Sequence, residues 1–285
     1  MKKILLPTDF SENSINAIRY ALAFFEREAC EFYILNVQKV SSFVSDDLMA
    51  MQPTESIFDS LIVAAKERIK NLTDDLVANH SNPLHTFKSN VDYDNFIDAI
   101  NQLVVIEKIN LIVMGTRGGS KLDKRIFGSN TIRVIQRCSC PVLAIPQGYT
   151  YEEISDIAFP SNYYTKYNAE DLFPLVSLAE KQDYTVHVIH VKDSEHLTEF
   201  QENNRAFLDS CFTNINHSFI ELEQGRLFKM INNYMAANSV DLLALMSRKH
   251  SFLERLFTTH PVESFAFNLK VPLLVMENTG EFYLK

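Results

Sequence analysis

Short, almost wholly apolar runs alternate with longer segments of helical periodicity along the whole chain. The first run is Ile4-Leu5-Leu6, and a helix with Ser11 as its candidate N-cap is expected to follow over residues 11–28. Strands that are apolar throughout are buried on both faces, as in parallel sheets that helices cover on both sides. The alternation therefore predicts an α/β fold with a doubly wound, mainly parallel sheet.

The same alternation defines the other elements of the first half. Strands are expected at 32–37, 84–89, 111–114 and 141–145, and helices at 56–80, 96–105 and 130–137. Residues 40–55 have no clear period and are expected to form a loop. Residues 146–150, with a proline and a glycine, are typical of a domain linker.

The second half of the chain repeats the first. Residues 156–160 resemble the opening strand with its proline, and residues 186–191 resemble the second strand. Residues 241–246 match 110–115, and residues 271–275 match 140–144, both at an offset of 131 positions. A shared offset across several elements indicates a duplication. We therefore predict two domains, at residues 1–148 and 149–285, each with a five-stranded, mainly parallel sheet.

Composition and charge exclude several classes of protein. Hydrophobic residues at 46% and charged residues at 22% are ordinary values for a globular protein. No apolar run approaches the roughly 20 residues that span a bilayer, so no membrane partner is expected. The net charge of −9 lacks the basic footprint of a general nucleic-acid binder. The cysteines complete no set of metal ligands and are expected to be free thiols of a reducing cytoplasm: Cys30, Cys138, Cys140 and Cys211.

Glycines are few but concentrated. The chain has seven, and four of them fall within fourteen residues, between a predicted strand and a predicted helix: Gly115, Gly118, Gly119 and Gly128. Ligands of open α/β sheets bind at the carboxyl ends of strands, where glycine lets the backbone approach closely. The free N–H groups at the start of the next helix suit a phosphate. A tight turn with packing glycines is the alternative interpretation.

The polar residues around these glycines favour an anion in the first half. Ser129 and Thr131 add hydroxyl groups, and Arg117 and Lys121 belong to a basic segment. Residues 1–148 carry a net charge of −1, whereas residues 149–285 carry −8. An anion is therefore more favourably placed in the first half.

The glycine segment and its surroundings resemble the nucleotide-binding universal stress proteins, whose G-x2-G-x9-G-S/T signature it matches as Gly115-x2-Gly118-x9-Gly128-Ser129. The resemblance covers the chain as a tandem pair. It implies two Rossmann-like domains of the adenine nucleotide alpha hydrolase-like fold and an adenine nucleotide as ligand: ATP, with AMP, ADP and Mg²⁺ as further candidates. It also implies the site residues Pro7, Thr8, Asp9, Val37, Met114, Gly115, Arg117, Gly118, Gly128, Ser129, Asn130 and Thr131.

Carried over residue by residue, the resemblance places Val37 at the adenine, largely through its backbone. Met114, Gly115, Arg117 and Gly118 border the ribose and phosphates, and residues 128–131 hold the phosphates. Asp9, with Pro7 and Thr8, belongs at the sugar or base end, because a carboxylate repels phosphate. Capping of the first helix is an equally good interpretation of Asp9.

The second copy departs from this pattern. Asn162 stands where the first copy has Asp9, and the counterpart of the glycine loop, residues 246–260, contains no glycine. Side chains there are expected to keep the backbone away from a phosphate. We therefore predict that residues 149–285 bind no nucleotide in the manner of the family.

The leading function is nucleotide-dependent regulation in a cytoplasmic stress response, without an assigned catalytic residue. The resemblance allows at most slow ATP hydrolysis, and a nucleotide-free interaction module is the alternative. The resemblance also implies that residues 142–145 and 273–276 pair to form an intramolecular pseudo-dimer, with a homodimer as a further state. His187 and His190 lie three positions apart on a predicted strand, so they are expected on opposite faces rather than in a metal site.

Overall fold

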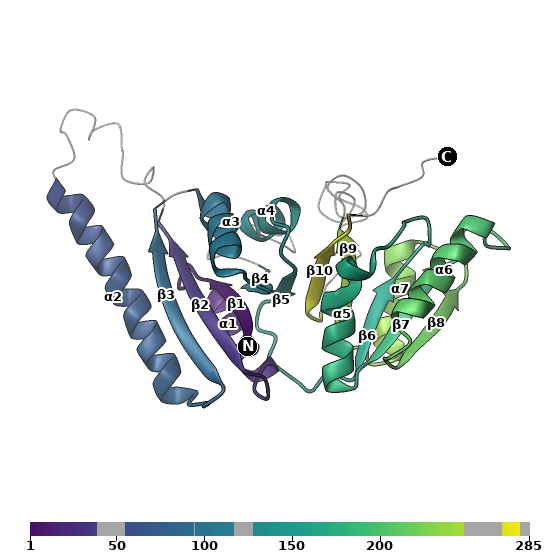
Figure 1. Ribbon diagram of the computed structural model, residues 1–285, viewed down its shortest axis with the longest axis horizontal. Coiled ribbons are helices and arrows are strands. Elements are labelled where there is room, and N and C mark those ends of the chain that lie inside the picture. The colour runs from purple at the N-terminus through teal and green to yellow at the C-terminus, as the bar shows by residue number, and fades with distance from the viewer. Residues whose placement is uncertain (39–54, 94, 117–127, 248–269, 280–285) are drawn as a thin grey trace. The chain divides into compact units, whose positions relative to one another are not determined.

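The computed structural model describes residues 1–38, 55–93, 95–116, 128–247 and 270–279 (Figure 1). The chain divides into two compact units, Met1–Cys140 and Pro141–Lys285. Each unit alternates strands and helices, as the periodicity predicts. None of the described helices is long and apolar enough to cross a membrane.

The first unit holds four parallel strands in the order β3-β2-β1-β4. They are β1 (Lys2–Pro7), β2 (Cys30–Val37), β3 (His85–Asp92) and β4 (Leu111–Gly115). The helices are α1 (Glu12–Phe24), α2 (Glu55–Asn79), α3 (Phe96–Glu107) and α4 (Ser129–Arg137). Helix α1 packs against β1 and β4, α2 packs against β2 and β3, and α3 packs against α4.

The opening strand and helix follow the sequence expectation closely. Ile4, Leu5 and Leu6 of β1 are wholly buried, as a strand covered on both faces requires. Ser11 is the N-cap of α1, and its Oγ accepts a hydrogen bond from the backbone N–H of Ser14 at 3.3 Å. The helix ends at Phe24, four residues before the expected end at residue 28, and residues 25–29 form the connection to β2.

The second unit holds six strands in the order β5-β10-β9-β6-β7-β8. They are β5 (Val142–Ile145), β6 (Asp156–Pro160), β7 (Thr185–Val191), β8 (His217–Leu222), β9 (Leu242–Ser247) and β10 (Leu273–Glu277). The helices are α5 (Ala169–Gln182), α6 (Glu199–Cys211) and α7 (Leu227–Ala237). All strand pairs in this unit are parallel except β5 with β10.

Strands β5 and β10 pair antiparallel, with Leu143 opposite Leu274. This is the pairing of residues 142–145 with 273–276 that the family resemblance implies. Because β5 is hydrogen-bonded to β10, its contacts group it with the second unit, and the units meet at Cys140 and Pro141 instead of after Gly148. That each sequence copy forms its own five-stranded sheet, with a domain boundary after residue 148, stays a prediction.

The cysteines are free thiols in the structure. Cys30, Cys138 and Cys140 are buried and Cys211 is half-buried. Burial raises the pKa of Cys138 to about 11 and that of Cys140 to about 12. Because the thiolate is the reactive form, these two side chains act as small apolar groups at neutral pH.

Candidate nucleotide-binding site

A cavity of about 300 Å³ lies at the carboxyl ends of β1, β2 and β4 in the first unit. Parallel strands bring these ends to the same edge of the sheet, where ligands of doubly wound folds bind. The lining comes from three strands, the turns that follow them and the starts of α1, α3 and α4: Pro7, Thr8, Asp9, Ser14, Val37, Phe96, Met114, Gly115, Asn130 and Thr131.

The turn from β1 to α1 fixes one wall of the cavity. Thr8 Oγ1 accepts the backbone N–H of Phe10 at 3.0 Å and lies 2.9 Å from the hydroxyl of Ser14. The carboxylate of Asp9 is exposed, and its Oδ1 accepts the backbone N–H of Ser11 at 3.0 Å. Ser11 is the residue that caps α1. Asp9 instead stabilises the turn that precedes the helix, through its hydrogen bond to the N–H of Ser11.

Gly115 at the end of β4 is required for packing. A Cβ built there would lie 2.2 Å from Nδ2 of Asn13 and 3.0 Å from the backbone oxygen of Asn13. Such contacts are far inside the van der Waals distance, so α1 approaches β4 this closely only because residue 115 has no side chain. The packing interpretation of the glycines therefore applies at Gly115, which also lines the cavity.

The start of α4 forms the opposite wall. Gly128 is its N-cap and has no side chain that could satisfy the first N–H groups of the helix. The backbone N–H of Gly128 donates to Thr116 O at 2.6 Å, which joins this helix start to the end of β4. Asn130, exposed in the first turn of α4, lines the cavity, so the positive end of the helix dipole lies beside it.

The hydroxyl of Thr131, which the resemblance places at the phosphates, makes a hydrogen bond within the protein in this structure. Its Oγ1 donates a hydrogen bond to Gly115 O at 2.9 Å, and the residue is almost wholly buried. A carbonyl oxygen only accepts, so the hydroxyl proton is already used within the protein. Thr131 thus ties α4 to β4 beneath the cavity.

The cavity separates apolar from polar features. Val37, Phe96 and Met114 supply apolar surface, Asp9 supplies a carboxylate, and the start of α4 supplies N–H groups. A flat apolar group, a hydroxyl-bearing group and an anion could each find a complementary wall. These three kinds of surface correspond to the base, the sugar and the phosphates of a nucleotide.

The structure brings together most of the residues that the sequence singles out. Pro7, Thr8, Asp9, Val37, Met114, Gly115, Asn130 and Thr131 line the cavity. Gly128 and Ser129 lie at the start of α4, next to Asn130, but they do not line the cavity itself. Arg117 and Gly118 lie outside the described residues.

Two lining residues, Ser14 and Phe96, were missed as site residues by the sequence reasoning. The sequence indicates only that the first helix begins near Ser11 and that residues 96–105 form a helix. The available signal was position: both lie in the first turn of a helix that follows the carboxyl end of a strand.

The corresponding place in the second unit is built differently. The connection from β6 to α5 spans residues 161–168, whereas that from β1 to α1 spans only residues 8–11. Ser161 repeats the turn of Thr8, since its Oγ accepts the N–H of Tyr163 at 3.0 Å. The hydroxyl of Tyr167, a buried residue, lies 2.7 Å from Ser161 Oγ, where Thr8 has the small Ser14. The counterpart of the glycine loop from residue 248 onward lies outside the described residues.

His187 and His190 have separate surroundings on β7. His187 Nε2 lies 2.7 Å from Asp156 Oδ1, and His187 Nδ1 lies 3.0 Å from Ser218 Oγ. His190 Nδ1 lies 3.0 Å from the backbone oxygen of Ser161. In the part of the chain that the structure describes, no three His, Cys, Asp or Glu residues are grouped as metal ligands.

Residues 1–146 match the universal stress protein family. The chain belongs to this family. Universal stress protein MJ0531 of Methanocaldococcus jannaschii is 32% identical over 145 residues, which cover 50% of this chain and 81% of that protein. Universal stress protein MJ0577 of the same organism is 25% identical over 157 residues, covering 50% and 94% of the two chains.

A solved structure extends the likeness in fold to the whole chain of this universal stress protein. The crystal structure of a universal stress protein from Archaeoglobus fulgidus covers 97% of this chain and 96% of its own, with a TM-score of 0.71 and 20% identity. At that identity the likeness establishes the Rossmann-like α/β fold and nothing about ligands.

Proposed function

We propose that the first unit binds an adenine nucleotide, with ATP as the principal ligand. The observation that carries the proposal is the cavity of about 300 Å³, whose lining includes most residues of the predicted nucleotide site. Membership of the universal stress protein family over residues 1–146 supports the same assignment.

The cavity walls suggest how the nucleotide lies. The adenine packs against the apolar surface of Val37, Phe96 and Met114, and its polar edge meets the backbone at the end of β2. The ribose hydroxyls donate to Asp9. The phosphates extend toward Asn130 and the first N–H groups of α4, where the helix dipole favours negative charge.

The nucleotide acts as a ligand that biases conformation, and no residue of the cavity is assigned as a catalytic base. By binding one state of the chain more tightly than another, it shifts the population between them. This is the physical form that nucleotide-dependent regulation in a stress response takes in our proposal. A cytoplasmic location stays a prediction.

Asn130→Asp tests the proposal without endangering the fold. Asn130 is exposed in the first turn of α4, where a carboxylate stabilises a helix through its dipole. The same carboxylate repels a nucleotide phosphate. We expect calorimetric titration of the full chain with ATP to show at least about tenfold weaker binding, equivalent to about 1.4 kcal/mol.

Gln136→Glu is the matched control, because it adds the same charge to α4 near the other end of the helix. It is expected to leave the dissociation constant for ATP unchanged. Wild-type protein that fails to bind ATP, or Asn130→Asp protein that binds as tightly as wild type, would refute the proposed site.

A further inference from the structure

A histidine of the second unit lies where helix α6 meets strand β8. His217 is the first residue of β8, and its ring meets that of Phe212, the C-cap of α6, edge to face with centroids 5.8 Å apart. The side chain of His217 is 17% exposed, whereas that of Asp209 on α6 is 64% exposed. The ring thus lies largely inside the protein, and its charged neighbour reaches solvent.

Both ring nitrogens of His217 lie beside groups that can only accept a hydrogen bond. Nε2 lies 2.9 Å from Asp209 Oδ1, and Nδ1 lies 3.1 Å from the backbone oxygen of Ile215. A neutral imidazole carries one N–H, so it donates to one of these groups and turns a lone pair toward the other. The imidazolium form carries two N–H groups and donates to both. The geometry therefore fits the protonated ring.

The end of α6 also favours a positive charge at this place. Asp209 lies in the last turn of the helix, where a carboxylate opposes the helix dipole, and this turn contains no basic residue. In the described part of the chain, Asp209 is the charged group that acts on the ring of His217. Strand β7 places Val186 opposite His217, and the carboxylate of Asp183 at the end of α5 accepts from the amide of Asn216 at 2.9 Å. A protonated His217 thus offsets the charge of Asp209.

These contacts act on the protonation of the ring. Burial disfavours the charged form, but the hydrogen bonds to Asp209 and to the carbonyl of Ile215 outweigh it and hold the pKa of His217 above its usual value of 6.5. A group with a raised folded pKa contributes its full stability below the unfolded pKa and loses it as the pH rises through the folded value. The contact with Asp209 therefore weakens as the solution becomes alkaline.

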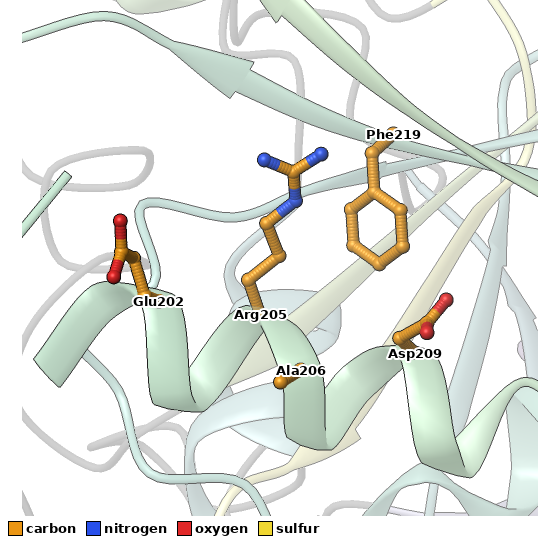
Figure 2. A pocket seen from close by; sticks show the side chains of 5 residues that line it. All are labelled: Glu202, Arg205, Ala206, Asp209 and Phe219. Carbon is orange, nitrogen blue, oxygen red and sulfur yellow. The ribbon is translucent and has the colours of Figure 1, made fainter. Parts of the chain in front are cut away.

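Asp209 also lines a hollow of about 350 Å³ beside α6, together with Arg205. The two residues are four positions apart on one helix, so their side chains lie on the same face, one turn apart. Figure 2 shows both on the side of α6 that faces Phe219, whose ring centroid lies 4.9 Å from the guanidinium of Arg205. In the structure Arg205 pairs with Glu221 at 3.5 Å and Asp209 pairs with His217. A pair between Asp209 and Arg205 would need no change in the backbone of α6.

We propose that His217 is a pH-dependent latch between β8 and α6. The protonated ring holds the carboxylate of Asp209 at the end of the helix. Loss of the proton leaves one acceptor facing another, so Asp209 turns toward Arg205 and competes with Glu221 for the guanidinium. A change of pH thereby rearranges the charges that line the hollow, independently of any nucleotide in the first unit.

An NMR titration of the imidazole groups of the full chain, from about pH 5 to about pH 9, tests the latch. The signals of His217 are identified by their absence from His217→Gln protein. We expect its pKa to lie above 6.5 and to fall in Asp209→Asn protein, which keeps the shape of the side chain and removes its charge. Glu202→Gln removes a charge from the same hollow, about two turns earlier on α6, and is expected to leave this pKa unchanged.

The carbon-13 resonance of Arg205 Cζ reports the second state. We expect it to shift with the same midpoint as His217 in the wild-type protein and in Glu202→Gln protein. It should stay nearly constant over this pH range in His217→Gln and in Asp209→Asn protein. Urea denaturation gives an independent measure, because the wild type should lose its advantage over Asp209→Asn as the pH rises through the pKa of His217.

Three results would overturn the proposal. One is a pKa of His217 at or below 6.5 in the wild-type protein. Another is an equal fall of this pKa in Asp209→Asn and Glu202→Gln, which would mean that the acidic surface as a whole sets the protonation. The third is an Arg205 signal that does not follow the titration of His217, which would mean that Asp209 does not change its partner.

Discussion

At Gly115 the backbone of β4 runs so close to α1 that the side chain of Asn13 occupies the space of a Cβ. The family signature assigns this glycine to the ligand, yet the packing of the unit requires it whether or not a ligand is bound. A single residue thus serves both the fold and the cavity wall. Sequence alone could not separate these roles, because the neighbour across the gap is more than a hundred positions away.

Gly115→Ala is expected to lower the free energy of unfolding of the first unit by about 1–3 kcal/mol, the usual cost of forcing an extra carbon into a packed site. Urea denaturation followed by circular dichroism measures the change. Combining it with Asn13→Ala should cost less than the sum of the two single changes, because the shortened side chain makes room. Strict additivity would contradict the steric explanation.

Asp9 and Asn162 provide a matched pair for separating turn geometry from ligand binding. Asp9 Oδ1 accepts the N–H of Ser11 at 3.0 Å, and Asn162 Oδ1 accepts the N–H of Tyr164 at 3.1 Å. Alanine at either position removes the same turn hydrogen bond. Only Asp9→Ala is expected to weaken ATP binding, by about 1–3 kcal/mol, the range for hydrogen bonds to charged groups. Equal ATP affinities of the two variants would leave Asp9 with a turn role alone.

At the scale of the element, the apolar runs of the sequence predict where the strands lie, but they predict the ends of the strands less accurately. The expected strand at 84–89 extends as β3 to Asp92, because Asn90, Val91 and Asp92 continue to pair with β2. Its polar end is typical of an edge strand, for which apolar periodicity is a weak signal. The structure of the long connection from β6 to α5 could not be predicted from the sequence either. Its tyrosines resemble core residues until the partners of their hydroxyl groups are known.

A polar network, buried at Tyr33 and Glu31 and exposed at Lys88, joins several elements of the first unit. The hydroxyl of Tyr33 on β2 lies 2.6 Å from Glu31 Oε2 and 2.8 Å from Glu107 Oε2 on α3. Lys88 Nζ on β3 lies 2.9 Å from Glu31 Oε1. The hydrogen bonds from Tyr33 and Lys88 hold the pKa of Glu31 below its usual value of 4.5.

Tyr33→Phe is expected to destabilise the first unit by about 1–3 kcal/mol at pH 7, because Glu31 stays buried and loses a donor. A carboxyl with a lowered folded pKa contributes stability above its unfolded pKa and loses it as the pH falls through the folded value. The variant should therefore show a shallower loss of stability below pH 4.5. Urea denaturation at pH 7 and across the acid range tests this, and curves that superimpose on wild type would contradict it.

At the scale of the whole molecule, two units of similar fold differ at the carboxyl end of their first strand. The glycine signature predicted the cavity of the first unit through Met114, Gly115, Asn130 and Thr131. The hydrogen bond from Thr131 to Gly115 was beyond the sequence, because it depends on how α4 docks on β4. The second unit keeps the turn after its first strand but fills the place of Ser14 with Tyr167.

One crystal structure grown with ATP tests this difference between the two units most directly. We expect electron density for one nucleotide per chain, with adenine beside Val37 and phosphates at the start of α4. Nucleotide bound in the second unit, or a first-unit cavity that stays empty at saturating ATP, would contradict it.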